Sequence, residues 1–491
     1  MKVLFLYFAV IISLNCWSKD FNIADYGAIG DGVTMNTKAI QLAIDNCAAA
    51  GGGRVIIPSG TFLSGTIILK DNVELHFEHS SVLLGSPRKD DFPLQPIPAF
   101  RALRGEEGFR ALIYAEGVKY IGLTGSGTID GQGAYHVREK EKPNDRPKNL
   151  MFISCRHVKV EGIHLTSSAF WNQHYLNCED VFVRNISVFN HSTYNNDAID
   201  IDGCRRFVVS DCIFDTDDDG ITLKSSGAAP TEDVVITNCI VSSFCNAIKA
   251  GTESTGGFRN IVISNCLVKP SISEGKPFFD TPRTGVTGLS LMVVDGGTME
   301  GITVNNLVIN GTMAPLYIRL GNRARKHIKE APVPPVGKVS NISISNLVAY
   351  NAGSWGSSVT GIPGYPVKNI SMNNIQFFSA GGVKKGTFQE IVDEAENKYP
   401  QPSVWGNLPA SGLFIRHAEG ISITGLVFGV EQLDERVPVV ADDVANLQIS
   451  GTRLAGAPVS GPFVKGKNLK EYQIEKPTGW FGTVIIQDDN H

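Results

Sequence analysis

The sequence predicts an all-β protein, a single-stranded right-handed parallel β-helix whose N-terminal end is closed by a capping helix. Three observations lead to this prediction: a short phrase recurs along the chain, apolar residues alternate within each phrase, and one N-terminal segment has helical periodicity. The chain is long, with 491 residues, and rich in turns, with 51 glycines. A solenoid of this length need not divide into domains, because each coil contacts only its neighbours.

The repeated phrase is apolar-x-apolar, then Asn, Asp or Gly, then a second apolar-x-apolar. Its first turn residues, 23 to 27 positions apart, are Gly162, Asn185, Asp211, Asn238 and Asn265. Later copies, separated by longer steps on average, are centred on Asn306, Asn346, Asn374, Gly425 and Gly451. Alternation with period 2 gives each short strand one buried face, and stacked coils bury it as a continuous core. A helical-repeat solenoid is the alternative, which the Val/Ile alternation disfavours.

The N-terminal segment from Thr37 to Gly53 has helical periodicity and a glycine stop. We expect this helix to cover the open end of the solenoid, where apolar core and strand edges would otherwise be exposed. Two stretches without the repeat, Arg138 to Lys148 and Asn322 to Val336, are predicted to be long loops on the solenoid wall.

The first residues have the composition of a secretory signal, with Lys2 before an apolar run from Val3 to Leu14. That run is too short to span a bilayer. We expect a signal peptide over residues 1–18, an exported protein, and one β-helix domain over residues 19–491. A lipid anchor on Cys16 is the alternative, although the preceding Ser-Leu-Asn is a poor lipobox.

Charge and cysteine content narrow the function classes. The formal net charge of −5 gives no electrostatic case for nucleic acid. No later segment is expected to span a membrane, and we expect a monomer. Cys212, Cys239 and Cys266 occupy the same place in successive phrases, which favours a ladder of buried thiols. Disulfides are the alternative in an exported protein.

Two aspartate clusters lie about one coil apart. One surrounds Asp197, and the other contains Asp218 and Asp219, of which Asp219 lies 22 residues beyond Asp197. Residues one period apart stack, so these carboxylates should converge and raise the pKa of at least one of them. Glycoside hydrolysis requires such a set, one protonated acid and one ionised base. Turn chemistry and calcium binding are the alternatives.

The alternation also predicts which side chains point outward. Ile199 and Ile201 should face the core, which turns Asp200 and Asp202 outward. The same rule in neighbouring coils turns five more side chains outward: Thr222, Lys224, Lys249, Tyr317 and Arg319. Cations beside carboxylates suit an anionic sugar polymer. Ordinary surface ion pairing is the alternative.

These residues resemble glycoside hydrolase family 28, the polygalacturonases and their relatives. Asn195-Asn196-Asp197 is similar to the family's Asn-Thr-Asp motif, Asp218-Asp219-Gly220 to its paired aspartates, and Phe170-Trp171-Asn-Gln-His174 to its Trp-x-x-His segment. The resemblance runs from Asp25 to the last coils. It implies a pectin-lyase-like fold and an inverting mechanism without metal or other cofactor. It also implies Asp218 as the general acid, with Asp197 and Asp219 holding and activating the water.

Two departures concern substrate binding. Asn246 stands where the family has the His of Gly-His-Gly, and the strand from Gly288 to Val294 lacks the family's Arg-Ile-Lys. We expect Lys249 and Arg319, with Arg323, to supply the missing contacts to substrate carboxylates. The other expected substrate-binding residues are Lys224, Asn246, Trp171 and His174. For Trp171 the alternative is a core or loop aromatic, and for His174 a hydrogen-bonded wall histidine.

The leading hypothesis is a glycosidase that cleaves a pectic or related uronic-acid polysaccharide or oligosaccharide. The departures leave room for exo action, another pectic linkage or another acidic polysaccharide. A polysaccharide lyase on the same fold is the second hypothesis, and it would need a Ca²⁺ cage and an Arg or Lys base. A non-catalytic carbohydrate-binding β-helix is the third, prompted by the missing motifs.

Overall fold

The computed structural model describes residues 19–101, 108–137, 139–140, 144–274, 285–456 and 461–488. The expected signal peptide over residues 1–18, with Cys16, lies outside these ranges. Among the helices in these ranges, none is long and apolar enough to cross a membrane.

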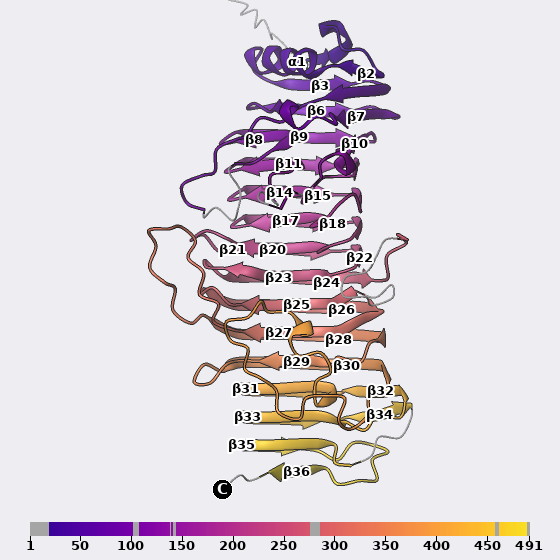
Figure 1. The fold of residues 1–491 in the computed structure, drawn as a ribbon, viewed down its shortest axis with the longest axis vertical. Coiled ribbons are helices and arrows are strands. Elements are labelled where there is room, and N and C mark those ends of the chain that lie inside the picture. Colours follow the sequence, from indigo (N-terminus) through magenta and orange to yellow (C-terminus); the bar gives the residue numbers. More distant parts are fainter. Residues whose placement is uncertain are drawn as a thin grey trace, which may run out of the picture.

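The chain winds into one stack of coils, from α1 at one end to β36 at the other (Figure 1). The N-terminal elements are β1 (Asp20–Asn22), η1 (Ile23–Tyr26), β2 (Asp31–Met35), α1 (Thr37–Ala49), β3 (Gly53–Ile57), β4 (Gly60–Ser64), β5 (Ile67–Ile68), β6 (Val73–Phe77), β7 (Ser81–Gly85), η2 (Lys89–Asp91), β8 (Ala111–Glu116), β9 (Lys119–Gly125), β10 (Thr128–Asp130) and η3 (Gly133–Tyr135). The central strands are β11 (Lys148–Ile153), β12 (Arg156–Glu161), β13 (His164–Thr166), β14 (Gln173–Leu176), β15 (Glu179–Arg184), β16 (Ser187–Asn190), β17 (Ile199–Asp202), β18 (Arg205–Ser210), β19 (Ile213–Thr216), β20 (Ile221–Ser225), β21 (Thr231–Thr237), β22 (Ile240–Ser243), β23 (Asn246–Ser254) and β24 (Phe258–Val268). The C-terminal elements are β25 (Gly285–Val293), β26 (Thr298–Asn310), β27 (Thr312–Leu320), β28 (Lys338–Ala352), β29 (Ser357–Thr360), β30 (Val367–Gly381), η5 (Pro402–Val404), β31 (Ala410–Thr424), β32 (Val427–Gln432), β33 (Val437–Ser450), β34 (Arg453–Gly456), β35 (Val464–Ile474) and β36 (Ile485–Asp488).

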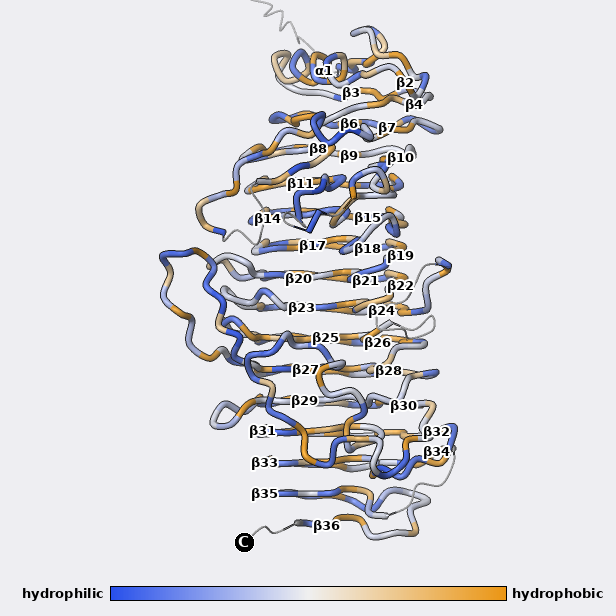
Figure 2. The backbone as a smooth tube through the Cα atoms, viewed as in Figure 1, coloured by the Kyte–Doolittle hydropathy of each residue, from blue (hydrophilic) through white to orange (hydrophobic). Residues whose placement is uncertain are grey.

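Every pairing between these named strands is parallel and joins one coil to the next, so the predicted parallel β-helix is confirmed. In one column the register runs Ile199, Ile221, Ile248 and Leu289, and all four side chains lie in the continuous core. The strands alternate apolar and polar positions along the whole stack, whereas the loop after β27 is largely hydrophilic (Figure 2).

The predicted turn residues bend the chain in the left-handed region. Asn185, Asp211, Asn238 and Asn265 have φ between 52° and 58°. Asn and Asp adopt this conformation more readily than other residues with a side chain. Neighbouring turns are also linked, because the Asn306 amide donates to Asn265 Oδ1 at 3.0 Å. The recurring Asn is therefore explained by backbone geometry and by a side-chain ladder.

The capping helix is confirmed over Thr37–Ala49, although the sequence placed its end later, at Gly53. Its apolar face buries Ile40, Ala43 and Ile44 against the first coil. The helix stops early because Gly51 and Gly52 have positive φ, and Gly53 already belongs to β3.

Buried thiols line two faces of the core. All eight described cysteines are free and buried, including the predicted trio Cys212, Cys239 and Cys266. The sequence analysis missed a second trio: Cys155, Cys178 and Cys204. In this trio, Cys178 N donates to Cys204 Sγ at 3.3 Å. Thiols at equivalent positions in successive coils thus fill small spaces in the core.

Two long segments cross the outer face of the sheet that contains β17, β20 and β23. On the N-terminal side, the backbone of Arg101 bridges to Gly227 in an antiparallel arrangement. On the C-terminal side, Trp405 and Leu408 pack on Tyr317 and Phe414, which point outward from the sheet. Outward-pointing residues are consequently buried here, so the predicted orientation is observed although these side chains do not reach solvent.

The turn ladder makes a testable contribution to stability. Asn306→Ala should lower the free energy of unfolding by about 1–2 kcal/mol, since it forces Ala into the left-handed region and removes one hydrogen bond. Asn306→Gly tolerates the same φ of 54° and should lose less. Urea denaturation midpoints of both variants would measure this. Equal losses for Ala and Gly would contradict the backbone part of the explanation.

Candidate active site

Successive coils bring the two aspartate clusters together. Asp197 ends the turn before β17, and Asp218 and Asp219 end the turn before β20. The Ala198 amide donates to the Asp219 carbonyl at 3.1 Å, so the two turns are adjacent. The Gly220 amide likewise donates to the Asn246 carbonyl at 2.9 Å, adding the next coil. The one-period spacing thus predicted the neighbourhood of these carboxylates.

Asp219 is held as an ionised carboxylate. Lys249 Nζ lies 2.5 Å from its Oδ2, and Asn246 Nδ2 lies 2.7 Å from its Oδ1. Burial alone would raise the pKa of Asp219, but the charges of Lys249 and Lys224, together with these hydrogen bonds, lower it. Asn246, which replaces the His expected from the resemblance, therefore supports the negative charge on Asp219.

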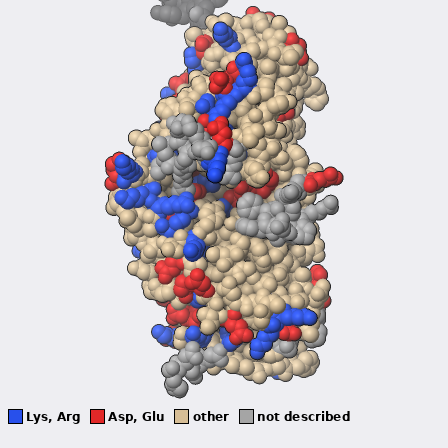
Figure 3. Space-filling view, viewed as in Figure 1, with Lys and Arg blue, Asp and Glu red and all other residues tan. Residues whose placement is uncertain are grey.

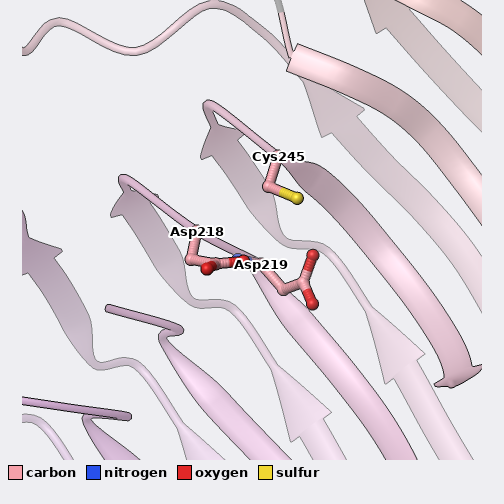
Figure 4. Close-up of side chains that lie close together, drawn as sticks. All are labelled: Asp218, Asp219 and Cys245. Atoms are coloured by element: carbon pink, nitrogen blue, oxygen red, sulfur yellow. The ribbon is translucent and has the colours of Figure 1, made fainter. Parts of the chain in front are cut away.

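The pKa of Asp218 is shifted in the opposite direction. Its Oδ1 accepts from the Asp219 amide at 2.9 Å, and its Oδ2 accepts from Asn195 Nδ2 at 3.2 Å. Burial and the charge of Asp219 raise the pKa of Asp218 to about 6. Figure 4 shows both aspartates emerging from one turn, with Cys245 on the neighbouring coil. Two consecutive carboxyl groups thus differ in proton affinity.

Asp197 is buried beside these groups, with 2% of its surface exposed. Burial and then the charges of Asp200, Asp218 and Asp219 raise the pKa of Asp197 well above its ordinary value. Within the described residues its Oδ1 has no hydrogen-bond partner. Asp197 therefore presents an oxygen that can bind a water molecule, while Asp219 has the lower pKa of the two.

Lys224 lies on the same outer column as Asp202. Its Nζ is 3.3 Å from Asp200 Oδ1, 3.5 Å from Glu253 Oε2, and 4.5 Å from the centre of the Trp171 ring. A cation over an indole face is favourable because of the ring quadrupole. Lys224 and Trp171, both predicted to bind substrate, therefore lie together beside the carboxylates.

His174 holds Trp171 and Asp202 in place from inside the wall of the solenoid. It is fully buried, its ring meets the edge of Trp171 at 5.0 Å, and its Nε2 lies 3.3 Å from Asp202 Oδ2. Burial lowers the pKa of His174 to about 3, so the imidazole is neutral. These contacts favour the alternative given for His174, a hydrogen-bonded histidine of the solenoid wall, over direct substrate binding.

Arg319 and Arg323 have other partners. Arg319 donates to the Gly361 carbonyl at 3.2 Å and stacks on Trp405 at 4.9 Å. Arg323 pairs with the buried carboxylate of Asp295, with Nε at 2.9 Å from Oδ1. Neither guanidinium hydrogen-bonds or ion-pairs with Asp197, Asp218 or Asp219 in the described part of the chain. Contacts between these arginines and substrate would require the present partners to be released.

Two buried arginines near the site were missed. Arg146 Nη2 donates to Asn195 Oδ1 at 3.3 Å, and Asn195 in turn holds Asp218. Arg101 Nε lies 3.0 Å from Ser226 Oγ and 3.8 Å from Asp202 Oδ2. Both come from loops without repeat periodicity, so no sequence signal could assign them. Asp217 was also passed over; burial and the charge of Asp218 raise its pKa to about 8.

The residues do not form an open cation cage. Asp218, Asp219 and Cys245 each offer one ligand atom within 4.8 Å of the others. However, protein N–H groups already donate to both oxygens of each carboxylate. Burial also raises the pKa of the Cys245 thiol well above its usual value. These contacts do not favour the calcium interpretation of the aspartates or the Ca²⁺ cage of a lyase.

Known proteins resemble this chain in sequence and in fold. The model of the family "Glycosyl hydrolases family 28" matches residues 47–271. A "Probable polygalacturonase" of Vitis vinifera is 25% identical over 423 residues, 82% of each chain. An "Exo-poly-alpha-D-galacturonosidase" of Dickeya chrysanthemi is 35% identical over 126 residues, 23% of this chain and 20% of that protein.

Solved structures show the same fold. The exopolygalacturonase of Thermotoga maritima superposes with a TM-score of 0.64 at 22% identity, over 84% of this chain and 91% of that one. The family 28 exopolygalacturonase of Yersinia enterocolitica also gives 0.64, at 20% identity, over 84% and 76%. Residues 47–271, which contain the stacked aspartates, thus match glycosyl hydrolases family 28, and together with the polygalacturonase relatives this match shows a glycosidase.

Proposed function

We propose that the chain hydrolyses the glycosidic bonds of polygalacturonan or a closely related pectic uronan, with inversion and from a chain end. The main support for this proposal is that the pKa values of two consecutive carboxyl groups are shifted in opposite directions. The pKa of Asp218 is raised to about 6, whereas the pKa of Asp219 is lowered by Lys249 and Asn246. An acid and a base side by side are what glycoside hydrolysis needs.

In this mechanism Asp218 donates its proton to the glycosidic oxygen as the bond to the anomeric carbon breaks. A water molecule held between Asp197 and Asp219 attacks that carbon from the opposite face. Asp219 accepts the proton that the water releases. The ion pair with Lys249 keeps Asp219 ionised before attack, and Asn195 keeps the Asp218 carboxyl in place.

The substrate class follows from the charges and from the relatives. Lys224 and Trp171 suit an anionic sugar, since they lie together beside the carboxylates and a substrate carboxylate can meet the lysine. The relatives named above as polygalacturonases support the same class. Among the residues that the structure describes, no contact specifically supports a lyase or a non-catalytic β-helix.

Exo action is supported by the segments that cover the sheet on both sides of the aspartates. Arg101 bridges to Gly227 on one side, and on the other Gln401 Nε2 lies 3.7 Å from Cys245 Sγ. A polymer bound through its middle would need an open groove along several coils. A chain end needs only one covered site.

Replacing the acid should strongly reduce turnover while leaving the fold intact. We expect Asp218→Asn to lower kcat on polygalacturonic acid by about 10²- to 10⁴-fold, since Asn cannot donate the proton. Asp217→Asn, on the same turn, is the matched control and should stay within about tenfold of wild type. Reducing-sugar release measures both. Full activity of Asp218→Asn would remove the acid role from this residue.

The rate should depend on pH with two limbs. As pH rises through about 6, Asp218 loses its proton and kcat/KM should fall. On the acid side kcat/KM should fall only below the ordinary carboxyl range, where Asp219 becomes protonated. Lys249→Gln removes the charge that lowers the pKa of Asp219, so its acid limb should move to higher pH. An acid limb that stays in place would contradict the role of Lys249.

The mode of attack can be read from the first products. On polygalacturonic acid we expect monomeric or dimeric products from the earliest time points, with slow loss of viscosity. Proton NMR of fresh products should show the anomer opposite to that of the cleaved bond. A ladder of intermediate oligomers would indicate endo action, and retained configuration would exclude the inverting mechanism.

A further inference from the structure

The loop between β27 and β28 begins on a rigid anchor. Arg323 pairs with Asp295, and the Arg325 backbone amide donates to the same carboxylate, 3.0 Å from Oδ1. The Ala324 amide donates to the Val294 carbonyl at 2.9 Å. The position of Arg325 is thus fixed through its main chain, without the use of its side chain.

The Arg325 guanidinium differs from those of Arg319 and Arg323. It makes no hydrogen bond or ion pair with any residue that the structure describes, and its side chain is exposed. Partial burial and then the neighbouring charge of Arg323 lower its pKa. A cation held beside another cation gains stability when an anion binds, since the anion offsets both desolvation and repulsion.

Arg325 also lies on the side of the site where cations are needed. Lys249 is committed to Asp219, and its Nζ is 6.0 Å from the centre of the Tyr399 ring. The loop anchor reaches the same site by direct contact, since Arg323 Nη1 donates to Thr252 Oγ1 at 3.1 Å. The adjacent residue, Glu253, lies 3.5 Å from Lys224 Nζ.

The surrounding charge is favourable for an anion. The same loop carries Lys326 and Lys329, both exposed. Figure 3 shows Lys and Arg side chains gathered over this loop, close to a recessed group of acidic side chains. The strand Gly285–Val293, where the resemblance would place cations, has none. A loop can supply what this strand lacks.

We propose that Arg325 receives the carboxylate of a uronate residue of the substrate, on the Glu253 side of the catalytic aspartates. This rests on the proposed function, since it assigns a specificity contact to the same site. The planar guanidinium can donate two parallel hydrogen bonds to a carboxylate, which an ammonium cannot do. Arg325 thereby distinguishes a free uronate from its neutral methyl ester.

Arg325→Gln tests this, with Lys329→Gln as the matched control on the same loop. The substrates are trigalacturonic acid and its fully methyl-esterified form. For the acid we expect Arg325→Gln to raise KM about 10- to 100-fold, with kcat changed less than about threefold. Its preference for acid over ester should fall by the same factor. Arg325→Lys should be intermediate, and Lys329→Gln should retain the wild-type preference.

Two results would overturn the assignment: an unchanged acid-to-ester preference in Arg325→Gln, or an equal loss in Lys329→Gln, which would indicate general steering by charge. Calorimetric binding of trigalacturonic acid to wild type and Arg325→Gln is measured in parallel. If wild type binds but does not turn over the acid, the proposed hydrolysis fails while the Arg325 contact is still decided. Unchanged thermal midpoints for the variants exclude misfolding, as expected for exposed side chains.

Discussion

Parallel hydrogen bonding between successive coils fixes the position of the side chains on the described strands. The register that aligns Ile199 with Ile221 and Ile248 in the core also aligns Asp200 with Thr222 and Lys249 outside it. A slip by one residue would exchange core and outer face in that coil. The apolar core thus specifies the geometry of the catalytic face, and the spacing of the aspartates need not be maintained by contacts of their own.

Loops cover the outer face of the sheet, so the charged side chains that the register places there are shielded from water and interact strongly. Asp197, Asp200, Asp218 and Asp219 are buried together, and the neighbouring lysines that lower their pKa are Lys148, Lys224 and Lys249. Such a set cannot be fully ionised. Contacts decide where negative charge resides: Asp219 has a lysine and an amide, whereas Asp218 has an amide and a backbone N–H. The division into acid and base follows from unequal partners on equivalent carboxyl groups.

The sequence could predict those features of the fold and of the site that follow from the coil repeat. Period-2 alternation gave the core and the outward direction of Lys224 and Lys249, and the one-coil spacing brought Asp197 to Asp219. Loop contacts were beyond reach, because they join residues far apart without periodicity. Gln401 meets Cys245 across 156 positions, and Arg101 reaches Ser226 across 125. Arg319 is a further example, because its guanidinium donates to the Glu394 carbonyl, which lies in a loop. The sequence could not show that this contact occupies the side chain predicted to bind substrate.

Cations on the strands and cations on the loops consequently have different uses. A lysine on the covered sheet is desolvated, and it requires a carboxylate nearby even in the free enzyme. Lys249 and Lys224 have such partners in Asp219 and Asp200. Their charge therefore serves first to set proton affinities of the catalytic groups. A loop cation such as Arg325 keeps contact with water and can remain unpaired until substrate arrives. The register of the coils then determines the chemistry, and the loops that cover them determine which substrate binds.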